Sequence, residues 1–419
     1  MQNNSLFFQA ILLGGVLAAL SSLWFRRRNR VQLPPGPKGH IIYGSAMELQ
    51  AADKLWLKLG YLKHPKGGLT SVRTLHKYMF VISDPSIAAE LLEKRAANYS
   101  DREVSPMMKL VGWDRSILFL SYGPLLKRYR AMLQRALNSR VSQDYIALQQ
   151  HEVQKFMRRL VETPDDFMTH VHLMAASTII RIAYGYSANS SNDDFIQRAA
   201  ELVAGFSDAT TPGRWAVDTF PFRAYPNSIL DPIFTITIVQ NLPVWFPFAT
   251  FHRQALYLKD LDTVHQTEPF NFTRKEMAKG TAKDSFASKL LQPEGGEHVD
   301  AETMEHIKVA GSDTTVSAVQ SFFLAMTLYP EVQAKAQAEI AAYAGQRPDT
   351  PSDNMLLPAD RSNLPYTSAL VRELLRWHPI INLVIHRSSD SDDCNVVVGG
   401  EVYRIPARSP VFVNVWSVI

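Results

Sequence analysis

The stretch "VAGSDTTVSAVQSFF" (residues 309–323) combines the apolar pattern of a buried helix with residues that weaken a helix. Its ends are apolar at helical spacing, which predicts a buried helix. Its centre carries Gly311, Asp313 and Thr314, residue types that weaken a helix or compete for its backbone hydrogen bonds. In one interpretation Thr314 bonds back to a carbonyl one turn earlier and Asp313 lies at the helix surface. In the other, Gly311 opens a groove where the hydroxyl and the carboxyl pass protons to a bound ligand.

The pattern of the remaining chain is mainly helical. Apolar residues at helical spacing predict helices at residues 85–99, 142–161, 195–206 and 331–343. β-Branched and apolar runs beside turn residues predict strands at residues 69–72, 79–82, 395–398 and 410–415. The sequence therefore predicts a mainly α fold with a minor β-sheet.

The composition is that of a globular protein with room for a large core. The chain has 419 residues, of which 46% are hydrophobic and 20% are charged. Its net charge is only +4, from 44 Lys and Arg against 40 Asp and Glu, so the charge gives no indication of a nucleic-acid partner. Cys394 is the single cysteine, which excludes a disulfide framework and a cysteine-based zinc site.

The N-terminus predicts a membrane anchor. Residues 6–25, "LFFQAILLGGVLAALSSLWF", carry no charge and would span roughly 30 Å as a helix, about one hydrocarbon core. Arginines at 26–28 and 30 follow, so we expect a single pass with the body in the cytosol. The competing signal peptide would need charges before the apolar run and a small-residue cleavage site after it. Residues 26–39 form a basic and Pro-rich linker that ends in the stiff "LPPGPKG".

A second candidate site follows the glycine-threonine stretch. In "ALVRELLRWHP" (369–379), Glu373 and Arg376 are three positions apart on one face of a helix that ends before Pro379. By itself this pair could be an exposed ion pair worth less than about 1 kcal/mol. The position of the pair along the chain favours a functional interpretation, because the anchor, the Pro-rich linker and the glycine-threonine helix precede it in this order. The segments "HRSSD" and "YRIPARSPVFVNVWS" follow it.

This combination resembles a cytochrome P450, and more closely the membrane-anchored fungal members of that family. The resemblance covers nearly the whole chain and rests on "LPPGPKG", "LLEKRAANYSDR", "YGPLLKRYRAML", "AGSDTTVSA", "ELLRWHP" and "NVWS". It implies a P450 domain over residues 40–419 and a haem-thiolate monooxygenase of secondary metabolism. Such an enzyme inserts one oxygen atom of O2 into a lipophilic small molecule. The resemblance further implies NADPH-cytochrome P450 reductase as the electron donor and the endoplasmic reticulum membrane as the location.

The resemblance also implies roles for individual residues. The softened turn at Gly311 would be where the central helix opens beside the haem, with Asp313 and Thr314 as the catalytic proton-delivery pair. Arg130 and Arg387 match positions that bind haem propionates, a task suited to always-charged guanidinium groups. The alternative for Arg130 is a surface charge on a helix.

Glu373 and Arg376 would be a structural pair under the haem. Residues 107–117 and 380–385 match segments that line the substrate pocket, although an ordinary core strand is an equal alternative for the second.

The sequence also departs from the family pattern. The axial cysteine of the family lies in a glycine-rich loop beyond "NVWS", and Cys394 has no such context, so we expect a P450 fold that is truncated before its iron ligand. The segment that locks Glu373 and Arg376 is expected beyond Ile419 as well. By the same comparison with the family pattern, we expect about two turns of the central helix to be missing before Gly311 and an insertion near residues 222–241.

We therefore expect the chain to be inactive for lack of its axial cysteine. The alternative function is a catalytically dead, membrane-tethered helical protein that binds a ligand or a partner. A serine hydrolase has no support, because the sequence has no G-x-S-x-G motif.

Overall fold

The computed structural model describes most of residues 31–418. Outside the description lie residues 42, 51–53, 62–67, 75–76, 139, 189, 191, 212–213, 220–249, 292–311 and 346–355. The predicted anchor at 6–25, the first part of the linker, the predicted insertion at 222–241 and Gly311 all lie outside the described residues. Among the helices that are described, none combines the length and the apolar character needed to cross a bilayer.

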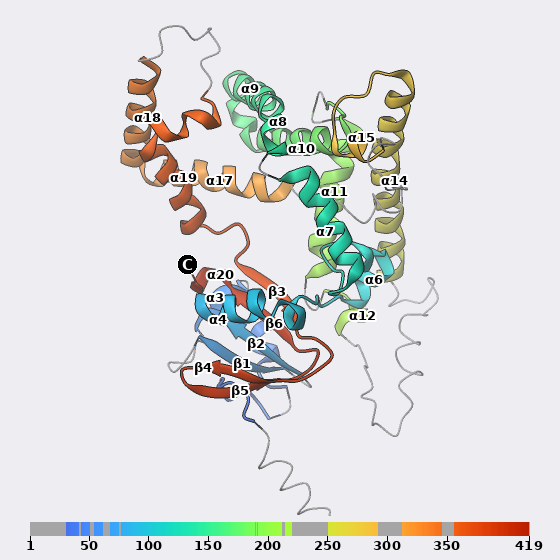
Figure 1. The fold of residues 1–419 in the computed structure, drawn as a ribbon, viewed down its shortest axis with the longest axis vertical. Helices are drawn as coiled ribbons and strands as arrows, with labels where there is room; N and C mark the ends of the chain where they lie inside the picture. Colours follow the sequence, from blue (N-terminus) through green and yellow to red (C-terminus); the bar gives the residue numbers. More distant parts are fainter. Residues whose placement is uncertain are drawn as a thin grey trace, which may run out of the picture. The chain divides into compact units, whose positions relative to one another are not determined.

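The chain divides into two compact units, which are considered separately. The first consists of Met1–Ser100 with Ile385–Val418, and the second of Asp101–Val384. Figure 1 labels their helices and strands. The assignment of residues 40–419 to a single P450 domain stays a prediction.

The first unit is built on a four-stranded sheet with the order β1-β2-β6-β3. Its strands are β1 (Leu69–Thr74), β2 (Lys77–Ile82), β6 (Pro410–Asn414) and β3 (Leu383–Arg387). β1 and β2 are antiparallel, with Leu69 opposite Ile82, whereas β2 and β6 are parallel, with Phe80 opposite Val411. Every residue of β2 from Met79 to Ile82 is buried, as expected of a strand that is covered on both faces.

A second, two-stranded sheet pairs β4 (Asp393–Val398) with β5 (Glu401–Ile405). The turn between them consists of Gly399 and Gly400, whose φ angles are 60° and 85°. Two successive residues with positive φ make the tight hairpin turn that matches the strand twist, and glycine adopts this conformation without strain.

Short helices complete the first unit. They are α2 (Ala46–Gln50), α3 (Leu55–Tyr61), α4 (Pro85–Ala88), a π-helical turn (Ala89–Lys94), α5 (Ala96–Tyr99) and α20 (Val415–Val418). Asp84 starts α4 because its side chain accepts hydrogen bonds from the backbone N–H groups of Ser86 and Ile87. The predicted helix at 85–99 is therefore present but interrupted by the π-helical turn.

The second unit is helical where described. Its earlier helices are α6 (Pro106–Val111), α7 (Pro124–Leu137), α8 (Val141–Asp144), α9 (Ile146–Glu162), α10 (Phe167–Tyr184), α11 (Asp194–Thr210) and α12 (Ala216–Thr219). Its later helices are α14 (Thr250–Lys279), α15 (Phe286–Leu290), α17 (Ser312–Leu328), α18 (Pro330–Gly345) and α19 (Pro365–Trp377). Short 3-10 helices lie at Trp113–Arg115, Pro164–Asp166 and Pro358–Asn363.

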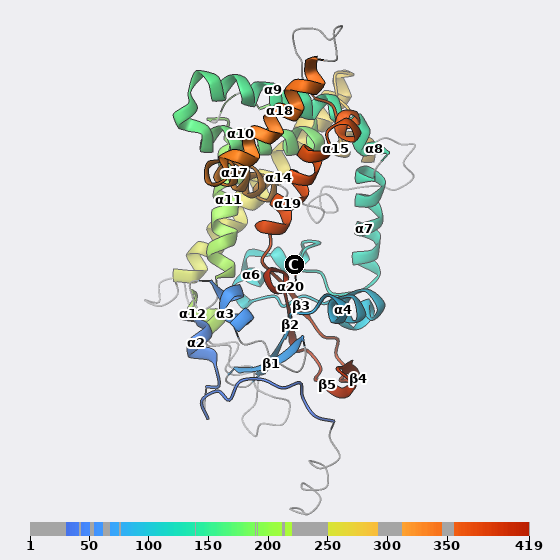
Figure 2. The same cartoon turned by 90° about the vertical axis from the view of Figure 1, so that its left-hand side faces the viewer.

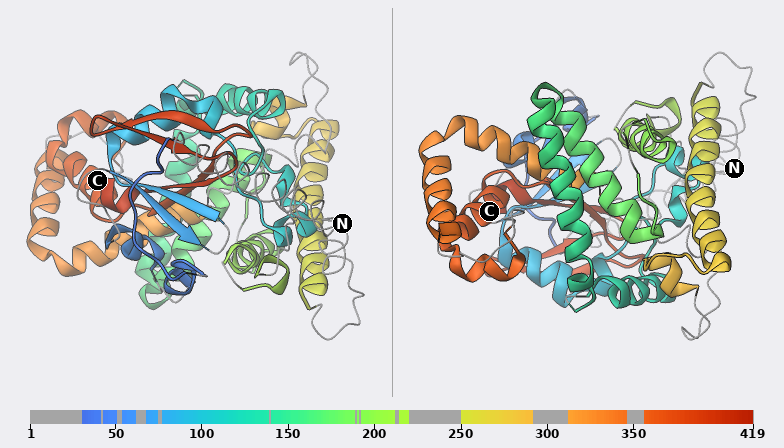
Figure 3. Two further views of the ribbon diagram at one scale, coloured as in Figure 1. Left: turned by 90° about the horizontal axis from the view of Figure 1, so that it is seen from below. Right: turned by 90° about the horizontal axis from the view of Figure 1, so that it is seen from above.

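Two helix contacts place the elements that matter for function. α10 packs against both α9 and α17 (Figure 2), and Val171 and Met174 share a core cluster with Phe156 and Val316. α11 lies next to α14 (light green and yellow in Figure 3), so closely that a Cβ atom added to Gly205 would lie 2.3 Å from Cδ2 of Leu258. The predicted mainly helical fold with a small sheet is confirmed.

Candidate functional site

The softened stretch of the sequence lies at the start of α17. Asp313 and Thr314 belong to its first turn, and the side chain of Thr314 is half-buried. Val316, one turn into the helix, is buried against α9 and α10. The apolar face of α17 therefore holds the helix in the core, while the two residues predicted to deliver protons lie where the helix begins. Their catalytic role stays a prediction.

α17 is also tied to the end of α19 by a polar contact. The hydroxyl of Ser321, which is buried, donates to the carbonyl of Ser317 at 2.8 Å and lies 3.0 Å from Nδ1 of His378. Leu374 of α19 packs on Ala325 and Met326 of α17. One face of α19 thus holds the glycine-threonine helix in place.

The predicted Glu373–Arg376 pair forms on the exposed face of α19. Arg376 donates from Nε and Nη2 to the two carboxylate oxygens of Glu373 at 2.8 and 2.5 Å. The hydrogen bond from Arg376 lowers the pKa of Glu373. Both side chains are more than half exposed, at 54% for Arg376 and 56% for Glu373. The spacing in the sequence therefore predicted the pair, and its place under a haem stays a prediction.

Arg130 lies on α7 beside an arginine that the sequence analysis did not assign. The buried face of α7 carries Leu126, Tyr129 and Met132, and Arg130 is exposed. The pKa of Arg102 is lowered, first by burial and then by the positive charge of Arg130. The backbone N–H of Tyr122 donates to Asp101 at 2.8 Å and holds the segment before α7 close to residue 102.

Arg102 and Arg130 thus place two positive charges close together. A guanidinium group is suited to binding carboxylates and phosphates, so an anion could bind to this pair. Arg102 could have been noticed in the sequence, since it ends the quoted motif "LLEKRAANYSDR". Its proximity to Arg130 required the tertiary structure.

Arg387 lies at the end of β3, in the first unit, where it is half-buried. Its neighbour Ser388 donates from its backbone to the carbonyl of Ser409 at 2.9 Å and from its hydroxyl to the carbonyl of Pro406 at 2.8 Å. These bonds hold the backbone that follows Arg387. Arg130 belongs to the second unit, so the predicted convergence of the two arginines on one ligand stays a prediction.

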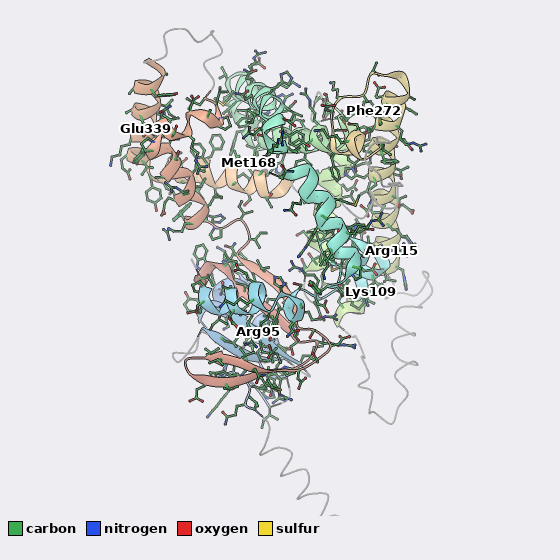
Figure 4. The ribbon with its side chains drawn as sticks, in the orientation of Figure 1. Arg95, Lys109, Arg115, Met168, Phe272 and Glu339 are labelled. Atoms are coloured by element: carbon green, nitrogen blue, oxygen red, sulfur yellow. The ribbon has the colours of Figure 1, made fainter. Side chains whose placement is uncertain are left out.

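Cys394 lies in β4, within the two-stranded hairpin, and is half-buried. The preceding residue, Asp393, accepts hydrogen bonds from Arg95 (labelled in Figure 4) and from the hydroxyl of Tyr99. Cys394 thus lies beside this hydrogen-bond network, where the pairing of β4 with β5 is irregular between Asp393 and Val396. Across the described ranges, no group of three or more His, Cys, Asp or Glu side chains is arranged to hold a metal ion.

Comparison with known proteins shows which family this chain resembles. The cytochrome P450 family model matches residues 34–419. A cytochrome P450 monooxygenase COX1 from Coprinopsis cinerea is 32% identical over 401 residues, which cover 92% of this chain and 72% of the relative. Cytochrome P450 monooxygenase 208 from Postia placenta is 32% identical, with 96% and 74% covered. Cytochrome P450 monooxygenase claR from Ampulloclitocybe clavipes is 31% identical, with 99% and 72% covered.

Proposed function

The chain belongs to the cytochrome P450 family, and we propose that it descends from monooxygenases that oxidise lipophilic small molecules in fungal secondary metabolism. The match over residues 34–419 is the observation that carries the assignment to P450 monooxygenases. The family's cofactor is haem, which supplies the activation of O2 when bound. The family also implies a redox-partner reductase and a lipophilic substrate.

The basic pair on the second unit fits one end of this cofactor. Arg102 is half-buried, and its pKa is lowered first by burial and then by the positive charge of Arg130. The propionate groups of haem are carboxylates, which guanidinium groups bind through paired hydrogen bonds. We therefore assign propionate binding to Arg102 and Arg130, with Arg387 as the third candidate.

The other end of the cofactor does not fit. The family binds iron through a cysteine thiolate, and Cys394, the single cysteine of the 419 residues, lies in a strand beside the Arg95–Asp393 pair. A β-strand held by that pair does not offer a thiol on a loop around an iron ion. Cys394 is therefore not placed as an iron ligand. The inactivity of the 419-residue chain stays a prediction, and so does the second candidate function, a tethered protein that binds an apolar ligand without turnover.

The predicted roles of the central helix follow from its chemistry. The hydroxyl Oγ1 of Thr314 and the carboxyl of Asp313 would hold and pass protons at the start of α17. Gly311, without a side chain, would leave room beside the ligand. Glu373 and Arg376 would act as a structural pair, because both oxygens of the Glu373 carboxylate already accept hydrogen bonds from Arg376.

The membrane and the electron donor complete the proposal. The uncharged run at 6–25 and the arginines after it support a single-pass anchor in the endoplasmic reticulum with a cytosolic body. In that place the chain would meet NADPH-cytochrome P450 reductase. Alkaline carbonate extraction of membranes tests the anchor, since a chain released into the supernatant would exclude it.

Two spectroscopic measurements test the haem proposal. The purified 419-residue chain, reduced and exposed to CO, should lack the absorption band of a thiolate-ligated haem, and the appearance of that band would overturn the expected inactivity. Titration with hemin should then show weaker binding for Arg102→Gln and Arg130→Gln than for Arg128→Gln, an exposed control on the same helix α7. Equal affinities of the three variants would contradict the propionate assignment.

A further inference from the structure

The buried face of α14 is interrupted by a polar layer, which we define as Asp262 and Gln266. Each of these side chains is only 7% exposed. They are four residues apart and therefore lie on one face of the helix, one turn from each other. Apolar residues continue the same face on both sides, with Leu258 one turn before the layer and Phe270 one turn after it.

The polar layer lies at the boundary between two apolar clusters of the second unit. Leu258 belongs to a cluster with Met107, Trp113 and Phe251. Phe270 belongs to another cluster, with Tyr129, Met132 and Phe286, against which Tyr184 packs. Two hydrophobic clusters therefore flank the hydrogen-bonding side chains of the polar layer. Apolar walls with a few polar groups are the composition that binds small molecules.

Asp262 is held by the residues around it. The indole N–H of Trp113 donates to its Oδ2 atom at 3.1 Å, in a buried contact. Burial, and next the negative charge of Asp262, raise the pKa of Tyr184 to about 12, so the phenol keeps its proton at neutral pH. The hydrogen bond from Trp113 thus fixes the position of the Asp262 carboxylate within the polar layer.

Gln266 differs from Asp262 in its hydrogen bonding. Within the part of the chain that the structure describes, neither its amide nitrogen nor its amide oxygen has a hydrogen-bond partner, and both atoms are buried. A buried amide without partners destabilises a fold, whereas Leu or Met at this position would fill a similar volume without that cost. A residue that opposes stability in the core is a candidate for binding.

We propose that Gln266 hydrogen-bonds a hydroxyl group carried by an otherwise apolar substrate, an inference that rests on the proposed function. The amide oxygen accepts and the amide nitrogen donates, and a hydroxyl group does both. The negative charge of Asp262 one turn away disfavours a carboxylate at the same place. The apolar clusters on either side would contact the rest of the molecule. Gln266 therefore determines specificity through a group that the substrate carries.

Paired fluorescence titrations test the inference without requiring haem or turnover. The full chain in nanodiscs is titrated with 2-naphthol and with naphthalene, which differ only by the hydroxyl group. For the wild type we expect tighter binding of 2-naphthol, by about tenfold, the factor for one good hydrogen bond. Gln266→Leu should abolish this preference and leave the affinity for naphthalene unchanged. Gln266→Met is the second variant if leucine does not fit, and Gln254→Leu, on the same helix, is the matched control.

The outcomes separate this inference from the proposed function. If both probes bind and Gln266→Leu retains the preference for 2-naphthol, Gln266 contacts only internal water and the inference is overturned. If neither probe binds to the wild type, the lipophilic binding site is overturned and the inference with it. A higher melting temperature of Gln266→Leu, together with the lost preference, is the result that we expect.

Discussion

Replacing Arg95 by methionine should destabilise the first unit, because Arg95 joins segments that lie far apart in the sequence. Its Nη1 atom lies 3.2 and 3.0 Å from the two carboxylate oxygens of Asp393, and its Nη2 atom donates to the carbonyl of Asn395 at 3.0 Å. Arg95 precedes α5, and Asp393 begins β4. Methionine keeps most of the aliphatic stem, so the substitution removes chiefly the charge and its hydrogen bonds.

The magnitude follows from burial. Removing one member of a fully buried ion pair costs about 3–5 kcal/mol. The side chain of Asp393 is 10% exposed, but that of Arg95 is 26% exposed. Asp393 also keeps hydrogen bonds from the hydroxyl of Tyr99 at 2.9 Å and from the backbone of Asn395 at 3.1 Å. Solvent and these remaining donors offset part of the loss, and we expect a cost of about 2 kcal/mol.

Urea unfolding of the purified chain measures the total cost, and hydrogen exchange locates it. The amides of β4 and β5 should exchange faster in Arg95→Met, because the pair holds β4 against the segment before α5. Lys94→Met is the matched control, since Lys94 forms a solvent-exposed ion pair with Glu90 and should contribute nothing measurable. An Arg95→Met chain that unfolds and exchanges like the wild type would refute the reasoning.

Two further predictions concern the helices of the second unit. Glu339 on α18 accepts hydrogen bonds from the first turn of α19, including the backbone and hydroxyl of Thr367 at 2.8 and 2.7 Å (Figure 4). Burial raises the pKa of Glu339, but these hydrogen bonds outweigh it and lower the pKa overall. The stabilisation is therefore present above the pKa of an unfolded glutamate and is lost as the pH falls, so Glu339→Gln should melt earlier than the wild type at pH 7 and approach it in acid. A melting difference independent of pH would contradict this. Gly205→Ala should cost about 1–3 kcal/mol by overpacking Leu258. Gly345→Ala, where no atom of the described residues lies within 4 Å of the new Cβ, should not destabilise α18 in the same urea unfolding assay. Equal stability of these two variants would contradict the close approach of α11 to α14.

The sequence by itself determined the parts of this protein that depend on near neighbours. Periodicity located α11, α18, β1 and β2, because a helix or a strand repeats its apolar residues every few positions. The three-residue spacing of Glu373 and Arg376 predicted their ion pair for the same reason. The break between α8 and α9 at Tyr145 was not visible, since the apolar pattern continues across it.

The tertiary structure decided every contact between segments that are distant in the chain. Arg102 and Arg130 approach each other because the backbone of Tyr122 binds Asp101, and no local pattern encodes that contact. Gln266 occupies a regular inward position of α14, and only the packing of the surrounding helices leaves its amide buried with no hydrogen-bond partner among the described residues. Local propensity is set by the backbone within a few residues, whereas the environment of a side chain is set by whichever segments fold against it.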